Sequence, residues 1–212
     1  MRMRKKPNLI PRLQKCERVL VREPEGLAGS WRTLFPGAAG EIHVELGCGK
    51  GRFTAETAQN EPEVCLIAIE KVPDAMVIAA ERVCALELTN VRFIIGDAVH
   101  LPELFAPGEV QRIYINFCDP WPTKRHEKRR LTSPGFLELY KKVLAPGGEI
   151  HFKTDNADLF EYSLPCFEQC GFALLDATRD LHAQGVCGVM TDYEAKFHAQ
   201  GVPIKRCVAR MK

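Results

Sequence analysis

Short apolar runs alternate with longer segments of helical spacing along most of the chain. The runs that predict strands lie at residues 42–46, 65–70, 91–95, 112–117, 149–154, 172–177 and 204–211. The segments that predict helices lie at residues 52–59, 73–88, 101–105, 134–144 and 156–170. The run at 65–70 is nearly all apolar, which is typical of a strand covered on both faces. This alternation predicts an α/β fold with a mostly parallel, doubly wound sheet and helices on both faces.

The first 30 residues do not follow this pattern. They are polar, are interrupted by proline and glycine, and predict only one short helix near residues 13–21. Lysines and arginines between residues 2 and 22 face a single acid, Glu17. We therefore expect a basic N-terminal arm over residues 1–30 and one domain over residues 31–212. The sequence leaves open whether the arm is a disordered tail, an RNA contact, or both.

Composition narrows the class of protein. The chain has 212 residues, of which 46% are hydrophobic and 26% are charged, as in a globular domain with a real core. The net charge is only +2, so the protein as a whole is not basic enough to attract nucleic acid by its total charge. The basic residues are instead gathered in local clusters. Nine cysteines without a C-x-x-C pair predict free thiols, no structural metal and a reducing cytoplasm. No apolar run approaches the length of a membrane span, so we expect no membrane partner.

Acidic or amide side chains stand at the ends of the predicted strands, one strand after another. These residues are Glu45, Glu70, Asp97, Asn116, Asp119 and Asp155. The carboxyl ends of parallel strands meet at one edge of a sheet, which is where such folds bind their ligands. We therefore expect these side chains to line a single site.

A glycine turn after the first predicted strand indicates the class of ligand. It reads GCGKG and contains Gly47, Gly49 and Gly51. The dinucleotide fingerprint has its third glycine one position later, and no Gly-Lys-Ser/Thr phosphate loop occurs. Glu45 would repel a pyrophosphate but suits the ammonium and sulfonium of S-adenosylmethionine, whose carboxylate fits the glycine backbone and a helix N-terminus. Glu70 can then accept from ribose hydroxyls and Asp97 from the adenine amino group; the alternative is that these acids are solvated strand ends.

Residues 116–130 read NFCDPWPTKRHEKRR and combine a stiff turn with a basic run. Proline fixes its own φ and has no N–H donor, so the Asp-Pro-Trp-Pro sequence that starts at Asp119 must leave the sheet as a rigid turn. Such a turn holds Asp119 still, as a reactive site requires. The basic run suits a polyanion such as RNA. The alternative is an ordinary loop with a solvated, charged face.

Together these segments resemble the bacterial tRNA (guanine-N7-)-methyltransferases, which have the Rossmann-like, seven-stranded class I methyltransferase fold. The matching stretches include ELGCGKG at 45–51, GDA at 96–98, NFCDPWP at 116–122, KTD at 153–155 and TDYE at 191–194. The resemblance covers about residues 40–212. It implies methyl transfer from S-adenosyl-L-methionine to N7 of a guanine in the tRNA variable loop, guanine 46. It implies tRNA as the partner and leaves monomer and homodimer open.

The resemblance also implies which residues form the site. Cofactor contacts fall on Glu45, Gly47, Gly49, Gly51, Glu70, Asp97, Ala98, Asn116 and Asp119. Substrate contacts fall on Thr123, Lys124, Asp155, Thr191, Asp192, Tyr193 and Glu194. RNA contacts fall on Lys124, Arg125, His126, Lys128, Arg129 and Arg130. The chain departs from the family at Thr123, where the family usually has lysine.

The chemistry of guanine N7 assigns a role to one carboxylate. N7 carries an in-plane lone pair, so no base is needed to create the nucleophile, and the methylated ring is positively charged. A carboxylate near the developing charge stabilises the transition state, and Asp119 is the candidate for this catalytic role. The donors on the pairing edge of guanine require a carboxylate, which Glu194 or Asp155 can supply. The alternatives are a helix N-cap for Asp155 and a surface capping box for residues 191–194.

Three other functions compete with this one. An N-methyltransferase acting on an exocyclic amino group of a base also has a turn after its fourth strand, of the type Asp/Asn-Pro-Pro-aromatic, but the order here is Asp-Pro-Trp-Pro. A non-catalytic RNA-binding protein would have no need of an intact glycine turn and a row of strand-end acids. A small-molecule methyltransferase would leave the basic run at 124–130 without a function.

Overall fold

The computed structural model describes residues 5–37 and 40–212, which form one seven-stranded sheet with the strand order β3-β2-β1-β4-β5-β7-β6. The strands are β1 (Ile42–Leu46), β2 (Cys65–Glu70), β3 (Val91–Ile95), β4 (Val110–Asn116), β5 (Leu144–Thr154), β6 (Phe172–Thr178) and β7 (Lys205–Met211). Neighbouring strands pair in parallel except for β7, which is antiparallel to β5 and β6. The predicted α/β class and mostly parallel sheet are confirmed.

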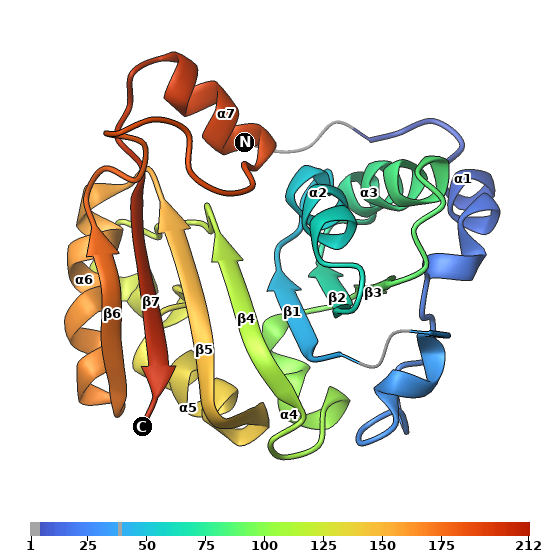
Figure 1. Cartoon of the computed structure of the whole chain (residues 1–212), viewed down its shortest axis with the longest axis horizontal. Coiled ribbons are helices and arrows are strands. Elements are labelled where there is room, and N and C mark those ends of the chain that lie inside the picture. Colours follow the sequence, from blue (N-terminus) through green and yellow to red (C-terminus); the bar gives the residue numbers. More distant parts are fainter. Residues whose placement is uncertain (1–4, 38–39) are drawn as a thin grey trace.

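Helices connect the strands and lie on both faces of the sheet. In the described part of the chain they are α1 (Leu9–Lys15), α2 (Arg52–Asn60), α3 (Pro73–Ala85), α4 (Leu101–Leu104), α5 (Pro134–Val143), α6 (Ala157–Gln169) and α7 (Asp192–Ala199). Figure 1 shows α1, α2 and α3 at the end of the sheet formed by β1, β2 and β3, and α5 and α6 behind β5 and β6. None of the described helices is both long and apolar enough to cross a membrane.

Strand β2 shows how the two faces are filled. Cys65, Ile67 and Ile69 belong to the core cluster that also contains side chains of α4, α5 and α6. Leu66 and Ala68 point the other way, into the cluster formed with α2 and α3. Successive side chains of a strand alternate between faces, so an all-apolar strand needs a core on each side. This is the arrangement that the run at 65–70 predicts.

Several predicted element boundaries differ from the structure. Helix α3 ends at Ala85 and not at residue 88, because Glu87 has a φ of 53° and a residue in the left-handed region cannot continue a helix. Strand β5 begins at Leu144 and not at residue 149, because Val110 of β4 pairs with Leu144 before a register shift. The strand expected at 112–117 runs from Val110 to Asn116.

The described part of the N-terminal arm packs on the sheet domain. Helix α1 begins at Leu9 and ends at Lys15, and a 3-10 turn follows at Glu17–Val19, so the short helix predicted near residues 13–21 begins and ends earlier in the chain. Pro11 lies in the first turn of this helix, where the backbone N–H has no partner in any case. Arg12 of α1 pairs through two bonds of 2.7 Å with Glu81 of α3, and the backbone of Leu20 bridges to Phe93 of β3. The division of the chain at residue 30 stays a prediction.

Helix α7 lies in the long connection between β6 and β7. Figure 1 shows it above the carboxyl ends of β4 and β5, the edge at which the strand-end acids were expected to gather. The sequence pattern predicts no helix here, only a capping box at residues 191–194. That capping box is confirmed, since Thr191 Oγ1 accepts from the backbone N–H of Glu194 at 2.9 Å, and a Glu194 carboxylate oxygen accepts from the N–H of Thr191 at 3.2 Å.

Candidate active site

Glu45 is a buried carboxyl group at the carboxyl end of β1. Its side chain is only 2% exposed and accepts a 2.5 Å hydrogen bond from Oγ1 of Thr54 on α2. Burial raises the pKa of Glu45 to about 7, and the Thr54 hydroxyl and the nearby Asn116 amide oppose part of that shift. A cationic group placed beside Glu45 would restore its ionised form, so the site favours a positively charged ligand.

The glycine turn after β1 has an open side and a closed side. Gly47, Gly49 and Gly51 have φ angles of 77°, 56° and 72°, a region that side chains other than glycine rarely adopt. A Cβ atom at Gly47 or Gly49 would meet no atom within 4 Å, whereas one at Gly51 would lie 2.5 Å from Cβ of Ala79 on α3. Gly51 therefore allows α2 and α3 to pack closely. The N–H groups of Gly47 and Gly49 already donate to the carbonyl of Ile69 and to Glu70, but the space over these two glycines is open. An anionic group in that space can meet the first turn of α2, whose N–H groups have no partner within the helix.

Glu70 is the last residue of β2, and Asp97 follows the end of β3. Glu70 accepts from the backbone N–H of Gly49 and from that of Val72, both at 2.9 Å. Asp97 lies 2.7 Å from Nζ of Lys71 and accepts from the N–H of Val99 at 3.3 Å. The structure therefore joins Glu70 directly to the glycine turn, a contact that the sequence pattern does not predict. Ala98, the next residue, is buried.

Asn116 at the end of β4 has a buried side chain with unused hydrogen-bonding capacity. It is 7% exposed, and neither its amide nitrogen nor its amide oxygen has a hydrogen-bond partner among the described residues. An unpaired buried amide is costly, so a site of this kind calls for a polar ligand. The Asn116 amide lies close enough to Glu45 to favour the ionised form of that carboxyl. An acid that suits a cation, an unpaired amide and an open glycine backbone together fit S-adenosylmethionine.

The turn that carries Asp119 is strained and braced. Phe117 and Trp121 have φ angles of 53° and 42°, and such values in bulky residues persist only where surrounding contacts enforce them. Arg130 supplies such contacts: its Nε donates to the carbonyl of Pro120 at 3.0 Å and its Nη2 to that of Trp121 at 3.1 Å. Asp119 itself is exposed at the top of this turn. The rigid turn expected from the two prolines is present.

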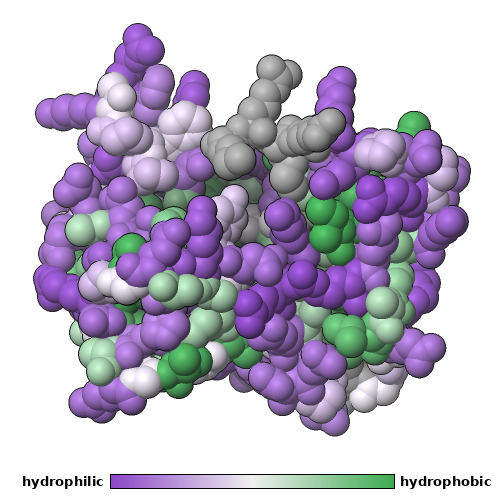
Figure 2. Space-filling model, turned by 90° about the horizontal axis from the view of Figure 1, so that it is seen from above, coloured by the Kyte–Doolittle hydropathy of each residue, from purple (hydrophilic) through white to green (hydrophobic). Residues whose placement is uncertain are grey.

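The basic run forms a short 3-10 helix, Lys124–Arg129. Lys124, Arg125, Lys128 and Arg129 are exposed, His126 is half-buried, and the guanidinium of Arg129 lies 5.0 Å from the centre of the Trp121 ring. Arg130 differs from these, because its guanidinium packs over the ring of Tyr162 at 4.2 Å and braces the turn. Thr123 is exposed directly before the run. Seen from above, the molecule is mostly hydrophilic, with hydrophobic residues in separate patches (Figure 2).

The predicted substrate residues near the C-terminus divide into open and buried ones. Asp155 is half-buried, and the N-cap of α6 is Asn156, whose Oδ1 accepts from the N–H of Leu159 at 2.7 Å, so the alternative N-cap role of Asp155 is wrong. Asp192 and Tyr193 are exposed, and Thr191 is half-buried. Glu194 is fully buried. The capping box is therefore present, but it does not lie on the surface as that alternative supposes.

Glu194 has two partners to which the sequence pattern assigns no role. Its carboxylate lies 3.0 Å from Nζ of Lys153, a buried lysine near the end of β5, and 3.0 Å from Nε2 of His182. Lys153 was recognisable only as part of the KTD stretch at 153–155. No signal in the sequence identifies His182. Among the described residues there is no group of three or more His, Cys, Asp or Glu that could hold a metal ion.

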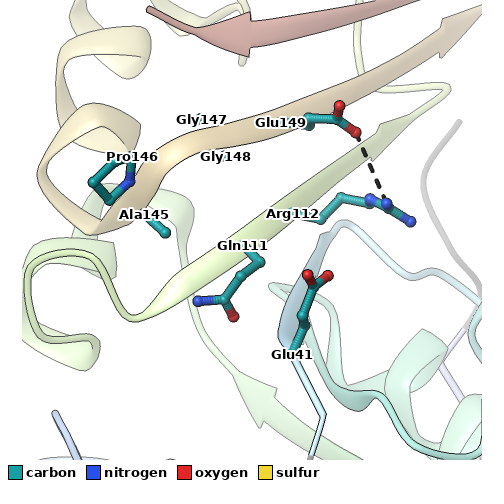
Figure 3. Close-up of a pocket in the computed structure, with 8 residues that line it drawn as sticks. All are labelled: Glu41, Gln111, Arg112, Ala145, Pro146, Gly147, Gly148 and Glu149. Carbon is teal, nitrogen blue, oxygen red and sulfur yellow. Dashed lines mark ion pairs between the residues drawn. The ribbon is translucent and has the colours of Figure 1, made fainter.

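A pocket at the opposite edge of the sheet is separate from this site. It is lined by Glu41, Gln111, Arg112, Ala145, Pro146, Gly147, Gly148 and Glu149, and Figure 3 shows Arg112 and Glu149 pointing toward one another. Their charged atoms lie 3.8 Å apart. These residues lie at the amino ends of β4 and β5, whereas Glu45, Asn116 and Asp155 lie at the carboxyl ends of their strands. The pocket therefore contributes nothing to the candidate active site.

Comparisons with known proteins agree with this geometry. A family model described as "Putative methyltransferase" matches residues 39–207. Among solved structures, the 16S rRNA methyltransferase KamB superimposes with a TM-score of 0.65 at 15% identity, covering 87% of this chain and 92% of that one, and this likeness shows the Rossmann-like class I methyltransferase fold.

Curated relatives match along nearly the whole chain. The tRNA (guanine-N(7)-)-methyltransferase of Geobacillus thermodenitrificans (strain NG80-2) is 46% identical over 99% of this chain and 97% of its own length. The enzyme of the same name from Listeria monocytogenes serotype 4b (strain F2365) is 43% identical over 99% of this chain and 98% of its own length. The matched regions include the glycine turn, the Asp119 turn and α7. The chain therefore belongs to the tRNA (guanine-N(7)-)-methyltransferase family.

Proposed function

We propose that this protein transfers the methyl group of S-adenosyl-L-methionine to N7 of a guanine in the variable loop of tRNA. The observation that carries the proposal is the buried Glu45 beside the unpaired Asn116 amide, at a strand edge that also holds the braced Asp119 turn and four exposed cations. The curated relatives bear the name of this activity. The finer assignment, guanine 46, rests on the family resemblance alone.

The residues at the strand ends divide the cofactor among them. Glu45 and Asn116 would hold the methionine part in the open space over Gly47 and Gly49. Glu70 would accept from the ribose hydroxyls, and Asp97 with Ala98 would hold the adenine. The bound cofactor supplies an activated methyl group on a sulfonium. The first turn of α2 supports this placement, because its N–H groups have no partner within the helix and favour an anionic carboxylate.

Asp119 would act on the charge that develops during transfer. The N7 lone pair attacks the methyl carbon without prior loss of a proton, and the imidazole part of the guanine becomes positively charged. A carboxylate on a rigid turn stabilises this charge more in the transition state than in the ground state, since it is already in place when the charge appears. The contacts of Arg130 with the carbonyls of Pro120 and Trp121 support this role for Asp119.

The tRNA would contact the surface around this edge. Asp155, Asp192 and Tyr193 can reach the guanosine, with Thr191 in the same segment and with Thr123 and Lys124 on the other side of the site. Lys124, Arg125, His126, Lys128 and Arg129 would contact phosphates, which position the RNA without reading its sequence. Arg130 is assigned to the Asp119 turn, because its guanidinium already braces two carbonyls.

A methyl-transfer assay tests the proposal. Unmodified tRNA transcripts are incubated with labelled S-adenosylmethionine, and the product is digested to nucleosides. We expect label in 7-methylguanosine, and its loss when the variable-loop guanine is replaced by adenine. Label in an N-methylated exocyclic amino group would replace the proposal with the closest competing function. Cofactor binding without any transfer to tRNA would refute tRNA as the acceptor.

A further inference from the structure

Helix α7 packs on the rest of the domain through a buried carboxylate. The residue of this helix that the structure buries is Glu194, with no exposed surface, whereas the buried residues of α5 are Leu137, Tyr140 and Val143. A helix of eight residues has little stability of its own and depends on the face it buries. The position of α7 therefore depends largely on the partners of one carboxylate.

Every oxygen of the Glu194 carboxylate is already engaged. Lys153 Nζ lies 3.2 Å from Oε1 and 3.0 Å from Oε2, and donates a further bond of 2.8 Å to the carbonyl of Val189. His182 Nε2 lies 3.0 Å from Oε1, and the N–H of Thr191 donates to Oε2 at 3.2 Å. A guanine that used this carboxylate would have to displace at least one of these donors from a site without access to water.

The hydrogen bonds of His182 define its state. The backbone N–H of Cys187 donates to Nδ1 at 3.2 Å, so that nitrogen is an acceptor and carries no proton. Nε2 therefore carries the proton and donates it to Glu194. A neutral histidine is sufficient for this arrangement, which leaves one positive charge on Lys153 balancing one negative charge on Glu194. The buried cluster is electrically complete without a ligand.

The cluster joins α7 to the strand ends that form the active site. Lys153 pairs in register with Asn116, the residue with the unpaired amide. The ring of Phe197 on α7 stacks on that of Phe117, at the start of the Asp119 turn, with ring centres 6.1 Å apart. Asp192 and Tyr193, the first two residues of α7, are exposed, and Asp192 lies 3.9 Å from Arg82 of α3.

From these contacts we infer that Glu194, Lys153 and His182 are positioning residues that fix α7 over the active site, and that Glu194 does not itself contact the guanine. The exposed residues of α7 and Asp155 then make the guanosine contacts, and Lys153 sets the position of α7 relative to Asp119. This inference rests on the proposed function and names the part of the site that determines tRNA affinity.

A double-variant cycle tests it. Glu194→Met alone leaves Lys153 buried without a counter-charge, and Lys153→Met alone leaves Glu194 in that state, so each single variant should lower the thermal midpoint. Each should raise the tRNA KM about tenfold or more, with the affinity for S-adenosylmethionine changed by less than about threefold. The double variant K153M/E194M contains no buried charge and should recover most of the midpoint and most of the tRNA KM. Lys141→Met, the same change in a surface ion pair with Glu138, should leave all three values unchanged.

The outcomes separate a positioning role from direct contact. If the double variant regains its midpoint but keeps the tRNA KM of E194M, Glu194 reads the guanine itself and the inference is overturned. A K153M enzyme with wild-type tRNA KM would overturn it equally. The wild-type enzyme in the same assay reports on the proposed function, and hydrogen exchange of residues 181–200 reports on the position of α7 without any substrate. Fast exchange in both single variants and renewed protection in the double variant are expected.

Discussion

The hydroxyl group of Thr54 on α2 donates a hydrogen bond of 2.5 Å to the carboxyl group of Glu45 on β1. This bond joins the first helix after the glycine turn to the acid that precedes the turn. It favours the ionised form of Glu45, but burial outweighs it and raises the pKa of the carboxyl to about 7. The free enzyme at neutral pH is therefore a mixture of protonated and ionised Glu45, and this mixture has measurable consequences for binding and for stability.

Binding of S-adenosylmethionine should release a proton. A cationic ligand beside Glu45 favours the carboxylate, so below pH 7 the enzyme must lose a proton to bind, and the affinity should fall about tenfold per pH unit there. At pH 7 the release should be about half a proton per cofactor, since half of Glu45 is protonated at its pKa. Titration calorimetry at pH 6, 7 and 8, in buffers of different ionisation heat, measures this number.

Glu45→Gln is the control for that measurement. Glutamine keeps the shape of the side chain but has no proton to lose, so this variant should bind the cofactor more weakly and without proton release. An affinity for S-adenosylmethionine that is flat from pH 6 to pH 8 in the wild type would contradict the prediction. It would mean that Glu45 is already ionised in the free enzyme.

The stability of the protein should depend on pH through two opposing groups. Burial lowers the pKa of His151 to about 4, so the unfolded chain binds the extra proton first as the pH falls below 6.5, and stability falls from there to about pH 4. The raised pKa of Glu45 acts in the other direction, since the folded state holds a proton that the unfolded chain releases above pH 4.5, and stability falls as the pH rises toward 7. Over the shared range the two slopes oppose each other.

Single variants should separate the two slopes. Urea unfolding of E45Q between pH 4.5 and 6.5 should show stability rising with pH, and His151→Asn should show it falling, by at most about 1.4 kcal/mol per pH unit for each group that titrates. Burial lowers the pKa of His43 as well, which adds to the slope of the E45Q enzyme. Variants with the same slope as the wild type would contradict both assignments. The stability of the double variant E45Q/H151N should keep only the rise with pH that His43 contributes.

The sequence predicts the parts of this protein that burial of apolar side chains determines. The strands are identified by runs such as 65–70, because a strand with a core on both faces has no polar positions. The row of strand-end acids is predictable since parallel strands end at one edge of the sheet.

What the sequence does not predict depends on contacts between distant residues. Helix α7 has no apolar stripe, because Glu194 is the residue it buries, and its partner Lys153 is 41 positions away. Arg130 cannot be distinguished from Arg129 in a basic run, yet one braces the Asp119 turn and the other is exposed. The bounds of α1 depend on its packing against α3, through the pairing of Arg12 with Glu81.

The two roles within the basic run should separate on substitution. Arg130→Met removes two donors to backbone carbonyls and the contact with Tyr162, so it should reduce kcat strongly and lower the thermal midpoint. Arg125→Met removes an exposed phosphate contact, so it should raise the tRNA KM, leave kcat and the midpoint unchanged, and reduce the slope of log KM against log salt by about one. A reduced salt slope in the Arg130 variant, with kcat retained, would identify Arg130 as another phosphate contact.

Alanine substitutions at two glycines of the same turn should have different effects on stability and on cofactor binding. In Gly51→Ala the new Cβ would lie 2.5 Å from Ala79 Cβ at a φ of 72°, so strain and steric overlap should cost roughly 3 kcal/mol of unfolding free energy. In Gly47→Ala the φ of 77° costs about 1 kcal/mol, and the methyl group enters the open side of the turn, where the cofactor is expected. Urea unfolding should therefore single out Gly51→Ala, and cofactor titration of the folded enzyme should single out Gly47→Ala. Unchanged S-adenosylmethionine affinity in the Gly47 variant would place the cofactor away from this turn.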